Sequence, residues 1–364
     1  MLKCFVCPKT YDENTPRYKC DCGGFLYHEF ERTPRIEPKE LANRPKSWWR
    51  YREALPLQSD ANIVTLKERP TSLRSARLGG TPVQVKLDGE CPTGSFKDRG
   101  SFLMVSKLKE WGLKAIVEDS SGNAGASIAA YSQVAGIKAE IYAPAYTSPA
   151  KLRNIAQYGA ELVTIAGSRE DTAKAALIEA ERTFYASHNW SPYFAAGVKT
   201  LAYELWEQFG FKAPDAVVVP VGGGSSLLGL YYGFMELANS GRIDRLPRLI
   251  AVQSEACAPL CQAFAAGKSD VSEVTKSSTI AEGIVIAKPV KGAAMLKALR
   301  DTDGTCLTVS DNEVLSALAE LTTHGVLVEQ TSGVGAAGFM KAVAAGIISS
   351  GEQIVIELTG KKKD

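Results

Sequence analysis

The sequence lacks the features that would tie the chain to a membrane or to nucleic acid. No apolar run approaches the roughly 18 residues of a membrane helix, and no apolar signal segment follows the N-terminus. The charges nearly cancel, leaving a formal net charge of +2, so nothing favours attraction to nucleic acid or anionic lipid. We therefore predict a cytoplasmic protein with neither nucleic acid nor a membrane as partner.

Repeats, low-complexity linkers and two common nucleotide-binding motifs are also missing. There is no Gly-x-Gly-x-x-Gly fingerprint, and the glycine run at 222–224 is not followed by Lys-Ser or Lys-Thr. Eight cysteines in 364 residues do not make a disulfide scaffold. What remains is an ordinary globular composition, 45% hydrophobic and 23% charged, long enough for two domains.

Strand and helix patterns alternate along most of the chain. Apolar strand-like segments alternate with helical ones in the first half, and further strands follow in the second. Repeated units of this kind predict parallel sheets with right-handed crossovers. The fold class is therefore α/β, with two doubly wound parallel-sheet domains that bind ligand at the carboxyl ends of their strands. The predicted strands are 83–87, 115–119, 139–143, 161–165, 216–220, 249–252, 305–309 and 353–358, and the main helices are 101–112, 124–135, 148–158 and 171–182.

The string Pro-Thr-Gly-Ser-Phe-Lys-Asp-Arg-Gly at 92–100 places Lys97 where a helix begins. A helix start and the neighbouring Arg99 both favour the neutral form of an amine, and a neutral amine is what a Schiff base needs. An isolated lysine at such a position is also explained as an ordinary solvated side chain.

Two loops between a strand and a helix offer donors to anions. The glycine run at 222–224, after an apolar strand, lets backbone N–H groups converge at a helix start, as a small phosphate requires. The loop Ser-Ser-Gly-Asn at 120–123 offers hydroxyls, an amide and open N–H groups to a carboxylate, although its Ser or Asn could equally cap the helix.

The string around Lys97 resembles the lysine motif of threonine synthases, which belong to the β-family (fold type II) of pyridoxal-phosphate enzymes. The segment Asp119-Ser120-Ser121-Gly122-Asn123, the loop 222–226 and the segment Leu358-Thr359-Gly360 resemble, in the same order, the family's substrate loop, phosphate cradle and cofactor-ring segment. The resemblance implies pyridoxal 5′-phosphate as cofactor, with Lys97 catalytic. The implied cofactor residues are Lys97, Asn123, Gly222, Gly223, Gly224, Ser225, Ser226 and Thr359, and the implied substrate residues are Ser120, Ser121 and Gly122.

The resemblance breaks where a substrate phosphate would bind. Phe194 stands where well-known threonine synthases carry an arginine, and Ala124 stands where a hydroxyl is frequent. Lys199, Arg153 or Lys151 could compensate, and Lys199 and Arg153 are the predicted substrate-binding cations. Two reactions therefore stay open. One converts O-phosphohomoserine and water to threonine and phosphate. The other is a β-replacement or β-elimination on O-phosphoserine, serine or threonine, as in cysteate-synthase-like or dehydratase-like relatives.

The N-terminus predicts a zinc-ribbon-like knuckle. Cys4, Cys7, Cys20 and Cys22 supply four thiolates for a structural zinc, although the second pair is Cys-x-Cys rather than Cys-x-x-Cys. The alternatives are a relic of a zinc site that binds no metal, or reduced cysteines that hold a small hairpin. We predict a knuckle at 1–30, a large cofactor-binding domain at 31–98 and 195–364, and a small substrate-loop domain at 99–194. We also predict a homodimer that acts on a small amino-acid substrate.

Overall fold

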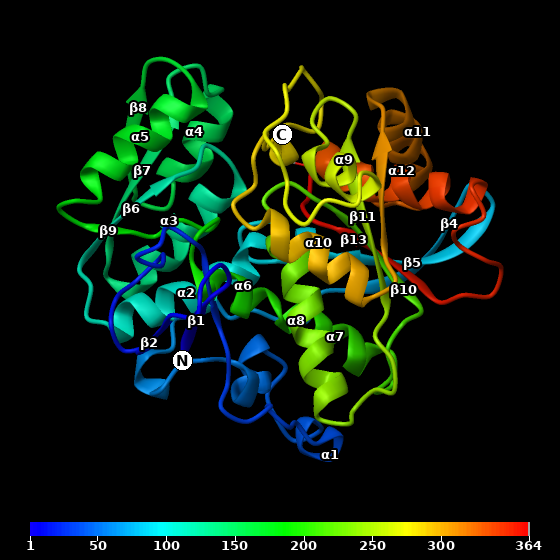
Figure 1. The fold of residues 1–364 in the computed structure, drawn as a ribbon, viewed down its shortest axis with the longest axis horizontal. Coiled ribbons are helices and arrows are strands. Elements are labelled where there is room, and N and C mark those ends of the chain that lie inside the picture. Colours follow the sequence, from blue (N-terminus) through cyan, green and yellow to red (C-terminus); the bar gives the residue numbers. More distant parts are fainter. Residues whose placement is uncertain (363–364) are drawn as a thin grey trace. The chain divides into compact units, whose positions relative to one another are not determined.

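The computed structural model describes residues 1–362, which form two compact units (Figure 1). The first unit comprises Met1–Pro34, Pro45–Arg69 and Lys97–Val198, and the second comprises Arg35–Arg44, Pro70–Phe96 and the chain from residue 199. Within these residues, no helix has both the length and the apolar character that a membrane crossing requires.

The first unit holds two sheets. A small antiparallel sheet at the N-terminus has the order β2-β1-β3, and a four-stranded parallel sheet has the order β8-β7-β6-β9. The strands are β1 (Leu2–Cys4), β2 (Thr10–Tyr11), β3 (Leu26–His28), β6 (Ala115–Asp119), β7 (Lys138–Pro144), β8 (Glu161–Ile165) and β9 (Phe184–Tyr185). The helices are η1 (Trp48–Ala54), η2 (Asp60–Asn62), α2 (Lys97–Glu110), α3 (Asn123–Ala135), α4 (Pro149–Ala156), α5 (Arg169–Glu179) and α6 (Pro192–Val198).

Local sequence signals explain where these helices begin. Ser148 accepts a hydrogen bond from the N–H of Lys151, and Pro149 occupies the first turn of α4. Ser168 and Asp171 form a reciprocal capping box at the start of α5. Such caps fix helix ends from a few neighbouring residues, so the predicted boundaries agree with the structure to within a few residues.

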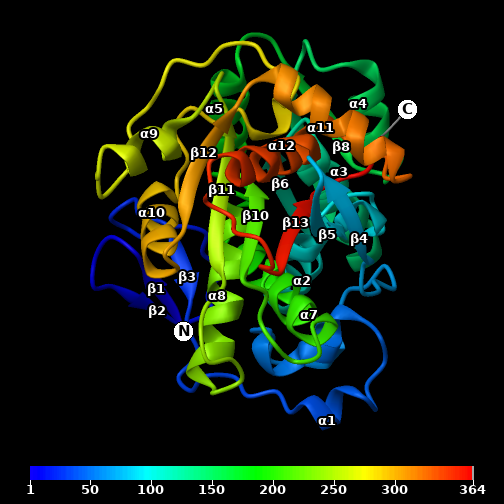
Figure 2. The same ribbon diagram turned by 90° about the vertical axis from the view of Figure 1, so that its right-hand side faces the viewer.

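The second unit is built on a six-stranded sheet with the order β12-β11-β10-β13-β5-β4 (Figure 2). The strands are β4 (Leu73–Leu78), β5 (Thr81–Leu87), β10 (Ala216–Pro220), β11 (Arg248–Ser254), β12 (Thr305–Val309) and β13 (Ile354–Leu358). The helices are α1 (Pro38–Leu41), η3 (Asp88–Glu90), α7 (Thr200–Gln208), α8 (Ser225–Asn239), α9 (Pro259–Ala265), η4 (Glu282–Ile284), α10 (Gly292–Asp301), α11 (Asp311–Thr323) and α12 (Gln330–Ala344).

Five of these six strands run parallel, which confirms the predicted fold class, and the edge strand β4 is an antiparallel addition that we did not predict. It forms a hairpin with β5 through Gly79 and Gly80, whose φ angles are +55° and +76°. A two-residue turn with both φ angles positive matches the twist of a hairpin, which explains the reversal.

Both faces of the parallel part of the sheet are buried. Val218, Ile250 and Ile356 belong to one hydrophobic cluster together with Phe339 of α12. Residues one position away in the strands, such as the fully buried Glu357, point to the opposite face because side chains alternate along a strand. This double burial is typical of parallel strands between helix layers.

The two compact units and the predicted domains divide the chain at different residues, most extensively within 31–98. We predicted residues 31–98 as part of the large domain, but Pro45–Arg69 belongs to the first unit with α2. The ring centroids of Trp48 and Trp49 lie 5.5 and 4.8 Å from that of Phe102, and the N–H of Val64 donates to Ser106 Oγ at 2.9 Å. The tryptophans therefore cover the core beside α2.

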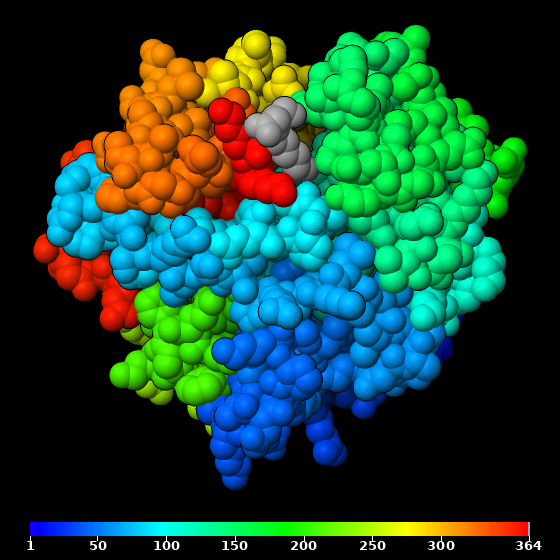
Figure 3. Space-filling model, turned by 180° about the vertical axis from the view of Figure 1, so that it is seen from behind, coloured from blue at the N-terminus to red at the C-terminus, as the bar shows by residue number. Residues whose placement is uncertain are grey.

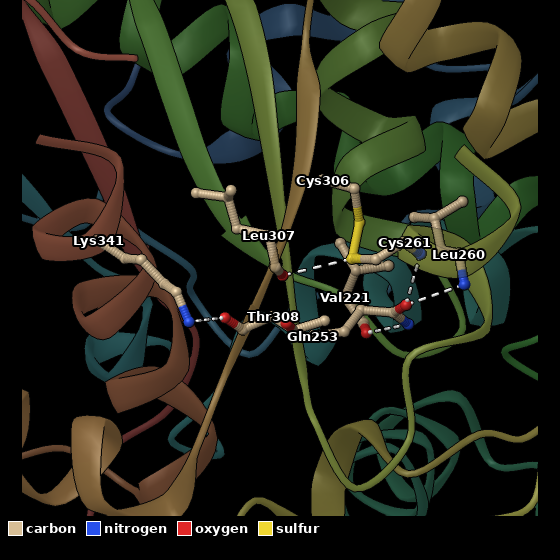
Figure 4. The surroundings of a disulfide bond; sticks show 8 residues. All are labelled: Val221, Gln253, Leu260, Cys261, Cys306, Leu307, Thr308 and Lys341. Atoms are coloured by element: carbon tan, nitrogen blue, oxygen red, sulfur yellow. Dashed lines mark hydrogen bonds between the residues drawn. A yellow bond between two sulfur atoms is a disulfide. The ribbon is translucent and has the colours of Figure 1, made fainter. Parts of the chain in front are cut away.

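A disulfide that the sequence analysis did not predict joins Cys261 of α9 to Cys306 of β12 (Figure 4). It closes a separation of 45 residues, for which chain-entropy arguments give about 4 kcal/mol of stabilisation. Gln253 lies beside it, accepting hydrogen bonds from Leu260 and Cys261 and donating to the carbonyl of Val221 at 3.1 Å. The cross-linked region therefore supports the strand end that precedes the glycine run.

Candidate active site

Lys97 is the first residue of α2, where the sequence predicts a helix start. Asp98 beside it is fully buried and accepts a hydrogen bond from Ser127 Oγ of α3 at 2.6 Å. The same hydroxyl lies 2.7 Å from Ser101 Oγ. Lys97 Nζ is 5.9 Å from the ring centroid of Phe194. The turn that carries the lysine is thus fixed to the helix that follows the substrate loop.

The predicted substrate loop, residues 120–123, joins β6 to α3. Ser120 is buried, and its hydroxyl accepts a hydrogen bond from the N–H of Gly122 at 3.4 Å. Gly122 occupies the N-cap of α3, whose first residue is Asn123, and no described side chain caps this helix start. Ser121 and Asn123 are therefore not used as the N-cap, and first-turn N–H groups point out of the helix. This arrangement suits a carboxylate.

Asp119 is the first residue of the loop motif, and its contacts fix the start of this loop, a role that the sequence did not indicate. Its carboxylate accepts a hydrogen bond from the hydroxyl of Tyr185 at 2.5 Å and pairs with the guanidinium of Arg169 at 2.7 Å. The position of Asp119 at the carboxyl end of a strand was visible in the sequence, but its two partners come from β9 and α5. Only the folded chain brings them together.

Glu118 and His188 form a buried pair behind the same loop. Glu118 is fully buried, and its Oε1 lies 2.5 Å from His188 Nδ1. Burial raises the pKa of Glu118 well above its ordinary value, and the charge of Asp119 raises it further. The His188 ring also lies 5.7 Å from that of Phe194. These contacts give His188 a structural role behind the loop.

Phe194 occupies the position where a phosphate-binding arginine would be expected. The residue is fully buried in α6, and its ring contacts α2 at Gly100, where a Cβ atom would collide with it. Because the ring also lies near Lys97 Nζ, the space beside the lysine on this side is apolar.

The two compensating cations that we predicted are placed very differently. Lys199 is buried, and its Nζ pairs with Glu236 Oε1 at 2.6 Å. The hydroxyl of Tyr203 donates to the other carboxylate oxygen of Glu236 at 2.8 Å. Arg153 lies exposed on α4. The ion pair already neutralises the charge of Lys199, whereas Arg153 is open to solvent.

The glycine loop, residues 222–224, leads from β10 into α8. Gly224 has a φ angle of +83° and caps α8 without a side chain. A Cβ on Gly222 would lie 2.8 Å from the Cα of Ile284, and a Cβ on Gly224 would collide with the side chain of Met295. The loop therefore needs glycine at both positions, and it leaves first-turn N–H groups of a 15-residue helix for an anion.

The two serines after the glycines differ. Ser225 is buried, and its hydroxyl has no hydrogen-bond partner among the described residues. An unsatisfied buried hydroxyl beside a glycine loop fits a phosphate ligand. The hydroxyl of Ser226 instead donates to the buried carboxylate of Glu357 in β13. Ser226 can therefore offer a phosphate its N–H but not its hydroxyl proton.

Thr359 follows β13 directly and is buried. Its hydroxyl lies 3.2 Å from that of Ser332, which donates to the carbonyl of Gly360 and accepts from its N–H. The N–H of Lys361 donates to the carbonyl of Gly94 at 3.0 Å. Part of the C-terminal region, coloured red, reaches the surface in Figure 3. Ser332 was not selected in the sequence because its helix carries no motif.

The four N-terminal cysteines converge as predicted. All four Sγ atoms lie within 4.8 Å of one another, a spacing compatible with one tetrahedral metal ion. Burial would raise the pKa of Cys20, but hydrogen bonds, led by that of Tyr11 at 3.0 Å, lower it to about 6. A thiolate is the metal-binding form. His28 points elsewhere, with its Nε2 2.6 Å from Glu13.

Comparison with known proteins identifies the class to which this fold and site belong. Residues 64–360 match the sequence profile of the pyridoxal-phosphate dependent enzymes. The chain is 33% identical to the threonine synthase of Methanocaldococcus jannaschii over 371 residues, covering 99% of this chain and 92% of the relative. It is 35% identical to that of Synechocystis sp. over 321 residues, covering 85% and 81%.

Solved structures agree with this class. A threonine deaminase from T.th. is 27% identical with a TM-score of 0.68, covering 81% of this chain and 94% of the relative. Maize serine racemase is 25% identical with a TM-score of 0.70, covering 81% and 89%. The chain belongs to the pyridoxal-phosphate-dependent enzyme family, as the resemblance of its motifs implied.

Proposed function

We propose that this protein is a threonine synthase-like lyase that converts O-phosphohomoserine and water to L-threonine and phosphate. The single observation that carries the proposal is the similarity to threonine synthases along 99% of the chain. Placement of Lys97 at a helix start and of Ser225 beside the glycine loop supports a pyridoxal-phosphate site.

The residues present fit that cofactor. When bound, its ring would accept electrons from the substrate's Cα and so ease bond changes at Cβ and Cγ. Lys97 would hold the cofactor covalently, residues 222–226 would bind its phosphate, and Thr359 would present a hydroxyl to its ring nitrogen. A hydroxyl partner leaves that nitrogen largely unprotonated, which suits elimination and replacement better than transamination.

The loop at 120–123 would recognise the substrate, and Lys97 would transfer protons. Ser120, Ser121 and Gly122 would bind the substrate carboxylate, and Asn123 would hydrogen-bond the cofactor ring. Once released by substrate, the amine of Lys97 would remove and return protons at Cα, Cβ and Cγ. The Cγ–O bond would break with loss of phosphate, and the proton taken from Cβ would pass through the lysine to Cγ. Water would then add its hydroxyl to Cβ, with its remaining proton balancing the released phosphate.

The residues at the expected position of the substrate phosphate favour a second function. Phe194 donates no hydrogen bond, and Lys199 is paired with Glu236. A dianionic phosphate is bound best by several charge-assisted donors. The alternative is therefore a β-replacement or β-elimination on O-phosphoserine, serine or threonine by the same cofactor.

Product analysis decides between these functions. Purified protein loaded with pyridoxal phosphate is offered O-phosphohomoserine, O-phosphoserine and threonine in parallel. Release of threonine and phosphate from O-phosphohomoserine supports the first function. Turnover confined to O-phosphoserine, serine or threonine would overturn it in favour of the second.

We also propose that Cys4, Cys7, Cys20 and Cys22 hold a structural zinc ion. Convergence of four Sγ atoms and the thiolate character of Cys20 support this assignment. Cytoplasmic location and homodimeric assembly are further parts of the proposal, and light scattering of the purified protein tests the assembly.

A further inference from the structure

Two glycines of the loop 222–224 contact residues that lie on either side of Lys291 in the sequence. Gly222 abuts the backbone of Ile284, and Gly224 abuts the side chain of Met295. Lys291 lies between these two contact residues, at the N-cap of α10, and is only 2% exposed. A lysine is almost never buried to this extent without a negatively charged neighbour.

The helix geometry directs Lys291 toward the loop. Met295 donates its N–H to the carbonyl of Lys291 at 3.0 Å, so the two residues are one helical turn apart. Side chains four residues apart lie on the same helix face, with Cβ atoms about 5–6 Å from each other. Because Met295 meets Gly224, Lys291 shares the face that meets the loop. Helix α10 packs against α8, which begins at that loop (Figure 1).

Two other lysines of the second unit are buried, and each lies in an ion pair. Lys86 pairs with Glu204, and Lys199 pairs with Glu236. Two carboxylates lie by the loop and the start of α10: Glu357 accepts a hydrogen bond from Ser226, and Asp270 lies beside Gly292. A phosphate dianion placed near Glu357 needs a compensating cation in this poorly solvated region.

We infer that Lys291 binds the phosphate of the cofactor seated on the glycine loop. The inference deepens the proposed function and rests on its assignment of the loop to pyridoxal phosphate. Lys291 supplies a point charge, Ser225 supplies the buried hydroxyl, and the start of α8 supplies N–H donors. No motif in the sequence marks this lysine, because its place depends on how α10 packs.

The test compares two ligands that differ only in the phosphate. Apoprotein is titrated with pyridoxal 5′-phosphate and with pyridoxal, and binding is followed by the visible absorption of the lysine adduct. Lys291→Met should weaken binding of the phosphorylated ligand on the order of ten- to a hundredfold, as expected for one charge-assisted hydrogen bond. Binding of pyridoxal should not change. Lys297→Met is the matched control on the exposed side of α10, where Lys297 pairs with Asp301.

Each outcome decides the question. Equal weakening of both ligands, or of neither, would overturn the inference and assign Lys291 to an ion pair with Glu357 or Asp270. Should Lys291→Met not fold, Lys291→Arg retains the charge. That variant must then still prefer the phosphorylated ligand, and loss of its affinity for both ligands alike overturns the inference. No amino-acid substrate is used, so failure of the threonine synthase proposal would be seen separately, in product analysis.

Discussion

The backbone N–H of Phe96 donates to the carbonyl oxygen of Thr359 at 2.8 Å. Ser95 pairs with Gly360 in the same way, as an isolated β-bridge. The chain therefore leaves the second unit for Lys97 at a point fixed beside the end of β13. Phe96 and Thr359 are more than 260 positions apart in the sequence. The position of residues 95–96, which lead into Lys97, therefore depends on the position of residues 359–360.

Replacement of Lys97 should abolish the covalent link to the cofactor while leaving the fold intact. We expect wild-type protein to be yellow and to lose its absorption band on borohydride reduction, because the amine of Lys97 forms a Schiff base. Lys97→Ala should show no reducible adduct and an unchanged circular dichroism spectrum. Peptide mapping that locates the reduced cofactor on another lysine would refute the assignment.

Replacement of Lys199 should act mainly on stability. Lys199→Met leaves the carboxylate of Glu236, which is 16% exposed, without its cation, and this should cost up to roughly 3–5 kcal/mol, the cost of breaking a buried pair. Lys199→Met combined with Glu236→Leu should recover part of that loss. Denaturant unfolding measures both. The exposed pair of Lys297 and Asp301 is the control, for which Lys297→Met should cost about 1 kcal/mol or less.

Replacement of Arg153 should act on the substrate phosphate. If O-phosphohomoserine is the substrate, Arg153→Ala should lower kcat/KM on the order of ten- to a hundredfold, because one charge-assisted contact is lost. Formation of the lysine adduct should not change. Steady-state kinetics with phosphorylated and unphosphorylated substrates measures the effect. Lys199→Ala belongs in the same comparison, and indifference of both variants would exclude these two cations from the phosphate site.

Zinc should be present at one ion per chain. Elemental analysis of protein prepared without chelators should find it, and Cys7→Ser should lose it, whereas Cys91→Ser should not, since Cys91 lies in the second unit. Chelation should loosen the N-terminus and leave the cofactor bound. Absence of zinc from wild-type protein would rule out the metal site and leave a reduced cysteine cluster.

Acid should remove a stabilising contact at Asp215. The N–H of Gln353 donates to its carboxylate at 2.7 Å, and this bond, with the charge of Arg245, lowers the pKa of Asp215. Because folding lowers the pKa of Asp215, its ionised carboxylate stabilises the folded protein at pH values above the unfolded-state pKa of 3.8. This stabilisation is lost as the pH falls from 3.8 through the lower folded-state pKa.

Asp215→Asn should therefore lower the free energy of unfolding by roughly 1–3 kcal/mol at pH 7 and by less at pH 3. Urea unfolding at both values measures the difference. Asp244→Asn, at a neighbouring exposed site, is the control and should show no such change. An equal loss at both pH values would mean that the carboxylate charge is not involved.

Much of this protein could be predicted from its sequence. Period-two and helical patterns located most strands and several helices, and Lys97, Asn123 and Ser225 each stand at a helix start because local signals end one element and begin the next. The cysteine spacing likewise predicted a cluster that the fold brings within 4.8 Å.

Only the tertiary structure decided which partners these residues have. Asp119 meets Tyr185 and Arg169, and Lys199 meets Glu236, through packing of distant elements. The same holds for the disulfide of Cys261 and Cys306. Local sequence specifies turns and helix ends through hydrogen bonds between near neighbours. Burial of a charge, by contrast, depends on side chains that meet only when sheets and helices pack, and no single stretch of sequence encodes that meeting.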